Sequence, residues 1–531
     1  MVERALILIK VGSPVAMKSS SARLLSSVAF LVLLSTTWAQ ENPRVQPAKS
    51  TTTAAPAKSG VKIPAGSQLL YGAMPISTKS LAARHNLEMA LDQYENASFE
   101  EAILHAQLAT EKDPNFALGY AVWSFTARRT APAPDALRKA KALAGKCIGD
   151  ECLMITFLVG SQEANVLPAI TAMNDLLSRR PHDKHVLYLS GEWLYFQQDY
   201  DHAKKVWIKS LEIDPNFPPA LNMLGYVYVE GGEPEPQKAV AYLKHYAAVA
   251  PNDGNPQDSL GEILRMTGDD PGSLAHYAEA LQIDPKMITS QYGRGDTYAL
   301  MGSYFQAKNE YEKALKLSTN PRGTIHIQFE LAMLDFWTND VSGGREALSK
   351  LSEQIAKDGD AASQFEVNYA RALLAADLAT ERRVLEQLDS LLSAAQPGMP
   401  DSERNAARAS VLREQVRIAV ASHQAQNAAV VLQKLQDMSD SSRDQLIESV
   451  CESAKGYVSL GAGDYAKAVE QLSADLHSPM VVREYISAEK KLGDAPGLER
   501  GENSLKYRRT PTAEWYLAGR GMTLSSQIVS E

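Results

Sequence analysis

Hydrophobic residues recur every three or four positions along most of this chain. The pattern begins near Ser77 and continues to about Arg520, and short glycine-containing turns separate one apolar stripe from the next. This spacing places apolar side chains on one face of an α-helix, whereas a half-buried strand would alternate residue by residue. No convincing alternating run occurs, so the sequence predicts an all-α fold built from many short helices.

A longer period is superimposed on the helical one. Four prolines stand 34, 36 and 34 residues apart, and a small residue lies twelve positions before each. The prolines are Pro181, Pro215, Pro251 and Pro285, and the small residues are Ala169, Ala203, Ala239 and Ser273. A unit of this length is too short to bury a core alone, so the period predicts helix pairs that stack side by side as a repeat array.

Each unit has a recognisable packing pattern. In the unit that begins at residue 184, Leu187, Gly191 and Leu194 form one face of a first helix, and Ala203 faces them from a second. Two helices at close approach leave no room for a large side chain, so we expect Gly191 and Ala203 to meet there. Aromatic residues are expected to fill the space between successive pairs. They are Tyr228, Tyr277, Tyr298 and Tyr311.

These residues resemble the tetratricopeptide repeat family, whose 34-residue unit has small residues at its eighth and twentieth positions and proline at its thirty-second. The resemblance covers residues 77–321, with the best register in 184–319, and weakens into divergent units over 322–520. It implies an elongated, right-handed α-solenoid. The sequence departs from the family at the fourth position, where Leu187, Leu221, Gln257 and Gln291 replace the frequent tryptophan, and Phe157 occupies a position that is usually small.

The resemblance also implies a binding surface. In the family, a second stripe of residues on each first helix lines a concave groove that holds peptides. Carried over position by position, the stripe comprises His185, Tyr188, Glu192, Tyr195, Asn222, Tyr226, Asp258, Glu262, Arg265, Tyr292 and Asp296. Aromatic faces among carboxylates suit an extended peptide with basic and apolar side chains. The alternative for any one of these residues is ordinary solvated helix surface.

The N-terminus predicts export. A secretory signal starting at Met17 has Lys18 and Arg23 before an apolar run and a cleavage site ending at Ala39. Residues 1–16 are interpreted as an upstream extension from an alternative start, so the mature chain is expected to lack residues 1–39. An uncleaved membrane anchor is the alternative. Residues 40–66 are rich in Pro, Thr and Ala and predict a disordered spacer, and residues 521–531 predict a flexible tail. We therefore expect a periplasmic or otherwise secreted protein.

Charge narrows the class of partner. The chain has 54 basic and 63 acidic residues, a net charge of −9, and loss of residues 1–39 removes four basic residues and one acidic residue, which gives −12. An acidic protein is not expected to bind nucleic acid or an anionic membrane surface. A protein or peptide partner with basic and apolar side chains fits this balance.

Three cysteines occur in the whole chain. Cys147 and Cys152 flank a turn between two predicted helices, and in an exported protein they either form a disulfide or remain two isolated buried thiols. Cys451 is expected to stay unpaired.

The sequence carries no motif for catalysis or for a cofactor, such as a phosphate loop or a nucleophile elbow. His182 and His185 are three residues apart, but no further ligand is spaced to complete a metal shell, so no metal is predicted. We therefore expect a non-catalytic scaffold that binds proteins or peptides.

Two alternatives stay open. The first is an envelope hydrolase with its site between residues 322 and 450, where Glu330 and Asp335 are five residues apart and do not share one helical face. A deep pocket with convergent carboxylates would favour this enzyme, whereas a shallow open groove would favour binding. The second is a structural spacer that oligomerises.

Overall fold

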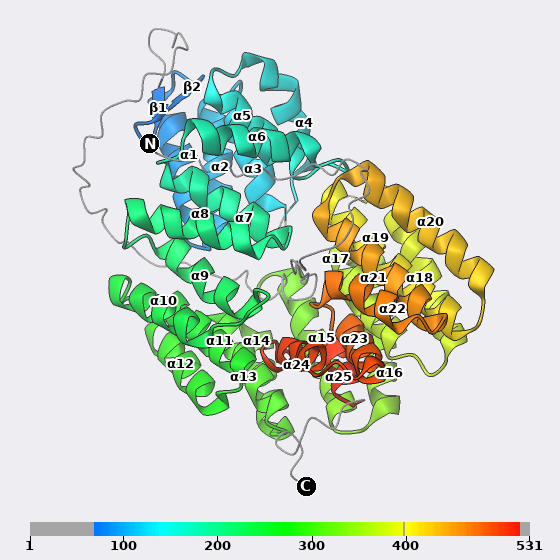
Figure 1. Ribbon diagram of the computed structural model, residues 1–531. Helices are drawn as coiled ribbons and strands as arrows, with labels where there is room; N and C mark the ends of the chain where they lie inside the picture. Colours follow the sequence, from blue (N-terminus) through cyan, green and yellow to red (C-terminus); the bar gives the residue numbers. More distant parts are fainter. Residues whose placement is uncertain (1–67, 129, 131, 397–398, 521–531) are drawn as a thin grey trace.

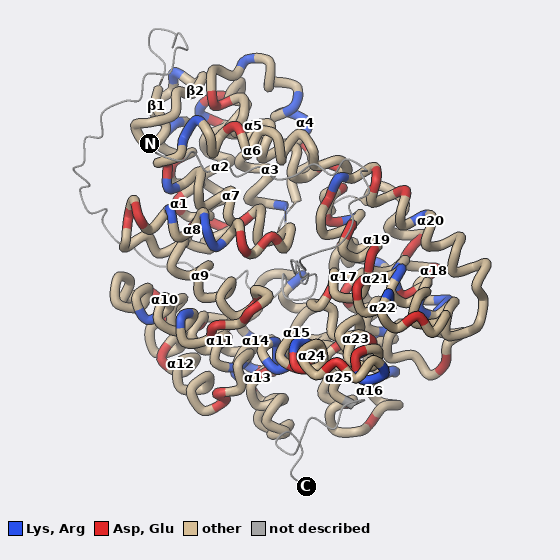
Figure 2. The backbone as a smooth tube through the Cα atoms, viewed as in Figure 1, with Lys and Arg blue, Asp and Glu red and all other residues tan. Residues whose placement is uncertain are grey.

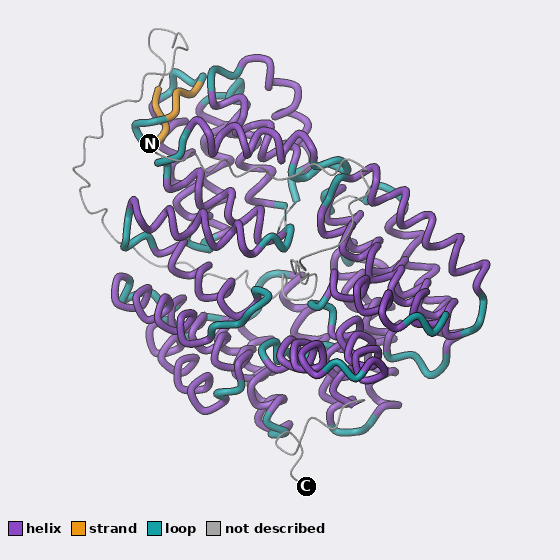
Figure 3. The backbone as a smooth tube through the Cα atoms, viewed as in Figure 1, coloured by secondary structure: helices purple, strands orange, loops and turns teal. Residues whose placement is uncertain are grey.

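The computed structural model describes residues 68–520 apart from 129, 131, 397 and 398, and in this part of the chain helices follow one another as antiparallel pairs (Figures 1 and 3). The helices up to residue 317 are α1 (Leu81–Glu95), α2 (Phe99–Lys112), α3 (Ala117–Ala127), α4 (Pro134–Leu143), α5 (Asp150–Gly160), α6 (Leu167–Arg179), α7 (Lys184–Phe196), α8 (Tyr200–Ile213), α9 (Pro218–Glu230), α10 (Pro236–Val249), α11 (Asn255–Thr267), α12 (Asp270–Ile283), α13 (Ile288–Leu300) and α14 (Tyr304–Leu317). The remaining helices are α15 (Pro321–Trp337), α16 (Val341–Asp358), α17 (Ala361–Leu373), α18 (Leu378–Ser393), α19 (Asp401–Ala421), α20 (Ala425–Ser442), α21 (Gln445–Gly461), α22 (Tyr465–Leu472), α23 (Pro479–Leu492), α24 (Ala495–Lys506) and α25 (Ala513–Arg520). The predicted helical solenoid is confirmed.

A small hairpin precedes the first helix, and the sequence did not predict it. Strands β1 (Gln68–Leu70) and β2 (Met74–Ile76) pair antiparallel. The turn between them holds Tyr71 and Gly72 at φ 49° and 74°, in the left-handed region that glycine favours. The hairpin buries Met74 and Ile76 against the first helices.

Helix starts follow ordinary capping chemistry. The Asp183 side chain accepts hydrogen bonds from the backbone N–H groups of His185 and Val186 at 3.1 and 3.2 Å, which satisfies two free donors at the start of α7. Many other helices carry proline in their first turn, where its missing N–H is tolerated, as at Pro218 of α9. The periodic prolines named above lie instead in the turns between units, as Pro215 does between the end of α8 and the start of α9.

Glycine on the first helix of a pair makes room for a large side chain of the second. A Cβ added at Gly191 would lie 2.3 Å from Nε1 of Trp207, which is fully buried. The expected close approach at Gly191 exists, and the atoms nearest to the added Cβ all belong to Trp207 and not to Ala203. The same pairing recurs at Gly225–Leu243, Gly261–Tyr277, Gly295–Tyr311 and Gly456–Leu472.

The solenoid curls back on itself instead of remaining extended. Successive first helices, such as α7, α9, α11 and α13, contact one another along the inner side. The backbone N–H of Val166 donates to the carbonyl of Ser442 at 2.9 Å, and the Ser402 hydroxyl donates to the carbonyl of Ser161 at 2.8 Å. Segments about 240 to 280 residues apart in sequence therefore touch, and the elongated particle that the sequence implied is replaced by a closed superhelix (Figure 1).

The C-terminal helix α25 helps to close this arrangement. Trp515 and Tyr516 of α25 pack against Trp337 at the end of α15, with ring centroids 5.8 and 5.0 Å apart. Glu514 of α25 accepts a hydrogen bond from the Tyr369 hydroxyl of α17 at 3.2 Å. The last described helix thus joins units that lie far apart along the chain.

Cys147, in the segment between α4 and α5, is bonded to Cys152 in the first turn of α5, and Cys451 is a buried free thiol. Within the described residues, no helix combines the length and the hydropathy that crossing a membrane requires. The predicted signal (1–39), spacer (40–66) and tail (521–531) lie outside the described residues.

Candidate binding surface

The eleven residues predicted to line a groove do lie on first helices, but they are enclosed. We use "inner surface" for the side of α7, α9, α11 and α13 that carries them. All but His185 and Asn222 are buried, and Arg265 is only 2% exposed. They therefore form an interior polar layer of the closed superhelix, and their role in binding stays a prediction.

The centre of the inner surface is a hydrogen-bonded chain of charged groups. The Tyr226 hydroxyl donates to Oε2 of Glu262 at 2.9 Å, and Arg265 approaches Glu262 at 3.3 Å and Asp296 at 3.9 Å. Burial raises the pKa of Glu262, although Arg265 and Tyr226 oppose the shift. Asp258 accepts a hydrogen bond from Ser290, and burial raises its pKa to about 7. These groups hold α9, α11 and α13 together.

Towards α7 the inner surface contains two further carboxylates. Glu192 accepts a short hydrogen bond from Tyr94 and lies 3.4 Å from Arg128. Tyr195 donates to Glu230, whose pKa burial raises to about 7 against the opposing effects of Tyr195 and Arg508. Acidic and basic positions are interspersed through both halves of the molecule, as Figure 2 shows.

A non-helical segment of the chain itself contacts this surface. We call residues 507–512, between α24 and α25, the C-terminal strap. Arg509 makes a bidentate ion pair with Asp270, at 2.8 and 3.0 Å, and its carbonyl accepts from Arg265 at 2.9 Å. Arg508 donates to the carbonyl of Glu230 at 2.7 Å. Two consecutive arginines of the strap are thus held by the acids and carbonyls of α9, α11 and α12.

Two cavities lie between the inner surface and the second half of the chain. The first, the central cavity, has a volume of about 110 Å³. It is lined by Phe125, Arg128, Ser161, Glu192, Trp193, Phe196, Gln197, Arg322, Ala362, Phe365, Glu366, Met399, Ser402, Glu403, Ala406, Asp444 and Leu446. The second, of about 80 Å³, is bounded in part by Glu230, Arg413, Asp475, Arg508 and Glu514. The interior is therefore enclosed and rich in carboxylates. It differs from the shallow open groove that the sequence analysis associated with peptide binding.

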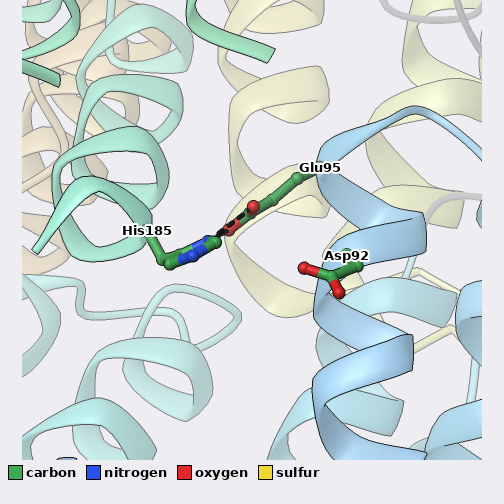
Figure 4. A group of neighbouring side chains, drawn as sticks. All are labelled: Asp92, Glu95 and His185. Carbon is green, nitrogen blue, oxygen red and sulfur yellow. Dashed lines mark hydrogen bonds and ion pairs between the residues drawn. The ribbon is translucent and has the colours of Figure 1, made fainter. Parts of the chain in front are cut away.

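His185 belongs to a cluster that sequence spacing could not reveal. Its Nδ1 lies 2.7 and 2.9 Å from the two oxygens of Glu95, and an oxygen of Asp92 is within 4.8 Å (Figure 4). Burial alone would lower the pKa of His185, but the Glu95 carboxylate outweighs it and raises the pKa. Asp92 accepts from the Tyr71 hydroxyl at 2.8 Å, and the Tyr71 ring stacks on His185. These partners make the cluster an ion pair that fixes the hairpin and α1 to α7.

Residues 288–321, which span α13 and α14, match the family described as tetratricopeptide repeat. This segment of the chain is a tetratricopeptide repeat. Its helix pairs are similar to those of solved repeat proteins, at low identity. No curated protein matches this repeat protein in sequence.

Three solved structures illustrate the extent of the similarity. A tetratricopeptide repeat protein from Parabacteroides merdae is 15% identical over 51% of this chain and 93% of its own, with a TM-score of 0.32. Yeast Tom70 is 14% identical over 79% and 89%, with a TM-score of 0.41. The pilF protein of Pseudomonas aeruginosa is 17% identical over 50% and 96%, with a TM-score of 0.27. Overlap of this extent carries no function from those proteins to this repeat protein.

Sequence reasoning missed the residues that close the interior of this repeat protein. Asp270 and Glu230 contact the strap, and Glu366 and Arg413 come from the divergent half. One signal existed: Arg508 and Arg509 are followed by Thr510 and Pro511, and proline disfavours the helical conformation of the residue before it, Thr510. That signal predicts an extended segment, although not the surface against which it lies.

Proposed function

We propose that this tetratricopeptide repeat protein is a non-catalytic scaffold of the cell envelope that holds extended basic and apolar segments of partner proteins against its inner surface. The repeats support a role in protein interaction. The predicted export signal supports the location.

The observation that carries the proposal is the way in which the strap is held. A segment that belongs to no helix or strand lies against α9, α11 and α12, and its arginines pair with Asp270 and with the Glu230 carbonyl. Arg265 in turn donates to the strap's own backbone. A basic peptide from a partner would need the same three contacts: an ion pair to a carboxylate, a hydrogen bond from arginine to a backbone carbonyl, and a hydrogen bond from the protein to the peptide backbone. The strap therefore shows, within one chain, how such a peptide could be held. A bound partner would take the place of the strap or extend from it.

The enclosed carboxylates also bear on the alternative hydrolase. A general acid or base must be able to reach a proton of the substrate. Around the second cavity, Asp475 lies 2.6 Å from Arg413, and Glu514 lies 3.6 Å from the same guanidinium. Glu330 is buried, whereas Asp335 is only partly buried, so the two candidate acids have different surroundings. Carboxylates that arginine already holds favour a structural role, so we retain the scaffold as the proposed function.

The test is affinity capture from an envelope extract with the full chain as bait. Asp270→Asn removes the charge that pairs with Arg509, and Glu279→Gln is the matched control because Glu279 is an exposed acid on the same helix, α12. We expect Asp270→Asn to reduce recovery of a specific partner about tenfold and Glu279→Gln to leave it unchanged. Equal recovery by both variants would contradict the surface that holds the strap as the binding site.

A further inference from the structure

The central cavity unites parts of the chain that are far apart in sequence. Phe125 lies on α3, Trp193 on α7, Phe365 on α17 and Glu403 on α19. A single water molecule needs roughly 10–15 Å³ of cavity volume. A cavity of about 110 Å³ therefore has room for on the order of eight non-hydrogen atoms. The cavity is therefore large enough for a small organic molecule.

Two buried carboxylates at the cavity each have one oxygen without a hydrogen-bond partner among the described residues. Oε1 of Glu192 is bonded to Tyr94, but Oε2 has no partner. Oε1 of Glu366 lies 2.8 Å from Nδ1 of His326, but Oε2 has no partner. The two residues are only 6% and 2% exposed. A buried acceptor left unpaired costs about 1–3 kcal/mol and more when it is charged, so each of these oxygens favours a further hydrogen-bond donor.

The two arginines at the cavity are already paired, which argues against an anion. Arg128 donates to the Phe125 carbonyl and to Tyr94, and its guanidinium stacks 3.7 Å from the centre of the Phe125 ring. Arg322 pairs with Asp360 at 2.6 Å. Four acids line the cavity against these two arginines, and His326 pairs with one of the acids, Glu366. The acids still outnumber these cationic groups by one, so the charge balance favours a cation.

The apolar walls specify the rest of the ligand. Phe125, Trp193, Phe196 and Phe365 line the same space as the carboxylates. Aromatic faces attract cations through their quadrupoles and also bury short apolar stems. We propose that the central cavity binds a small organic cation, a guanidinium or alkylammonium group on a short apolar stem, with Glu192 and Glu366 as hydrogen-bond acceptors.

This site goes beyond the proposed function, because it does not involve Asp270 or the strap arginines. The same cationic group has two sources: a free small molecule, or an arginine or lysine side chain at the surface of a partner. Both sources present the same charge and the same donors, so one set of probes tests the shared chemistry and a second distinguishes the sources.

The direct test is isothermal titration of the full chain with n-butylguanidinium, which has eight non-hydrogen atoms. Its neutral counterpart n-butylurea has the same shape, and n-butyrate is the anionic probe. We expect the guanidinium to bind at least about tenfold more tightly than either, since one charge-assisted hydrogen bond contributes that much. This comparison uses only the natural chain, so it does not depend on whether a variant folds.

Variants then assign the site. Glu366→Gln keeps the shape but removes the charge, and we expect it to weaken n-butylguanidinium binding about tenfold. Glu330→Gln is the matched control, because Glu330 is also buried with an unpartnered oxygen but does not line the cavity. Titration with a blocked Ala-Arg-Ala tripeptide and its citrulline counterpart separates the sources. Tighter binding of the arginine peptide than of n-butylguanidinium identifies a partner side chain, and the reverse identifies a free ligand.

Three results would overturn the proposal. They are equal affinity for n-butylguanidinium and n-butylurea, preferential binding of n-butyrate, and equal loss in Glu366→Gln and Glu330→Gln. None of them affects the capture experiment with Asp270→Asn, so failure of the cavity and failure of the scaffold can be told apart.

Discussion

Replacement of Gly191 by alanine tests the packing on which the solenoid depends. The new Cβ would lie 2.3, 2.6 and 2.7 Å from Nε1, Cε2 and Cδ1 of Trp207. Trp207 is fully buried and donates to the Tyr188 carbonyl at 3.2 Å, so it cannot move without breaking this bond. Overpacking of this kind costs about 1–3 kcal/mol, and loss of the hydrogen bond adds about 1. The higher helix propensity of alanine returns about 1 kcal/mol, so we expect a net destabilisation of about 1–3 kcal/mol.

The assay is urea unfolding of the full chain, together with hydrogen exchange of α7 and α8. The exchange measurement is needed because a repeat array can unfold in segments, so one global free energy does not describe it. We expect faster exchange in α7 and α8 and little change in distant units. Gly519→Ala is the control, since nothing lies within 4 Å of a Cβ at that helical position, and it should be neutral or slightly stabilising.

A double-mutant cycle makes the reasoning falsifiable. Trp207→Ala alone should cost about 3–5 kcal/mol. Once the ring is gone, adding Gly191→Ala should cost nothing or stabilise the chain, because only the gain in helix propensity remains. The reasoning is refuted if Gly191→Ala is as stable as the natural chain, or if its cost is the same with and without Trp207.

Four further predictions follow from individual side chains and their contacts. Burial raises the pKa of Glu230, Asp258 and Glu514 to about 7, above the ordinary value near 4, so their contribution to stability is present at low pH and is lost as pH rises towards 7. Burial would lower the pKa of His326, but Glu366 outweighs it and raises the pKa to about 9, so His326 loses its contribution between about pH 6.5 and 9. The free energy of unfolding should therefore be higher at pH 5.5 than at pH 8.5, and Glu230→Gln should reduce the difference; a chain that is more stable at pH 8.5 would contradict these shifts. The disulfide joins residues five positions apart, so Cys147→Ser with Cys152→Ser should lower the free energy of unfolding of the units around α5 by about 2 kcal/mol. The denatured, unreduced natural chain should show one reactive thiol, and three would contradict the disulfide. Tyr226→Phe removes the hydroxyl that bonds to Glu262 and should cost about 0.5–1.5 kcal/mol in urea unfolding. Alanine at Tyr188, Tyr226 and Tyr292 together should destabilise the chain strongly, because all three rings are buried. A native-like urea midpoint for the triple variant would show that their burial is not stabilising. Arg509→Ala breaks the pair with Asp270 and should speed hydrogen exchange of residues 507–512 several-fold, while unchanged exchange would mean that the arginine does not hold the strap.

The sequence predicts those features that depend on local spacing. Glycine at position 191 and its equivalents indicates close helix contact, and the residues assigned to the inner stripe do lie on first helices. These features repeat, so a short window contains all the information that they need.

Closure of the superhelix could not be predicted in this way. The contact of Val166 with Ser442 depends on curvature accumulated over many units, including the divergent ones whose period is irregular. The inner surface is enclosed because of this contact and because of the strap, and neither affects the helical pattern around Tyr188 or Tyr226. The same side chains are therefore compatible with an open groove and with a covered one.

Binding of a peptide in trans tests the central claim most directly. The probe is a fluorescent peptide with the sequence of residues 504–513, and the protein is the full chain with Arg508→Ala and Arg509→Ala, whose own strap lacks the side chains that contact Asp270 and Glu230. If the inner surface recognises extended basic segments, this variant binds the peptide at least about tenfold more tightly than it binds the same peptide with citrulline at both arginines. Equal anisotropy curves for the two peptides would contradict the claim.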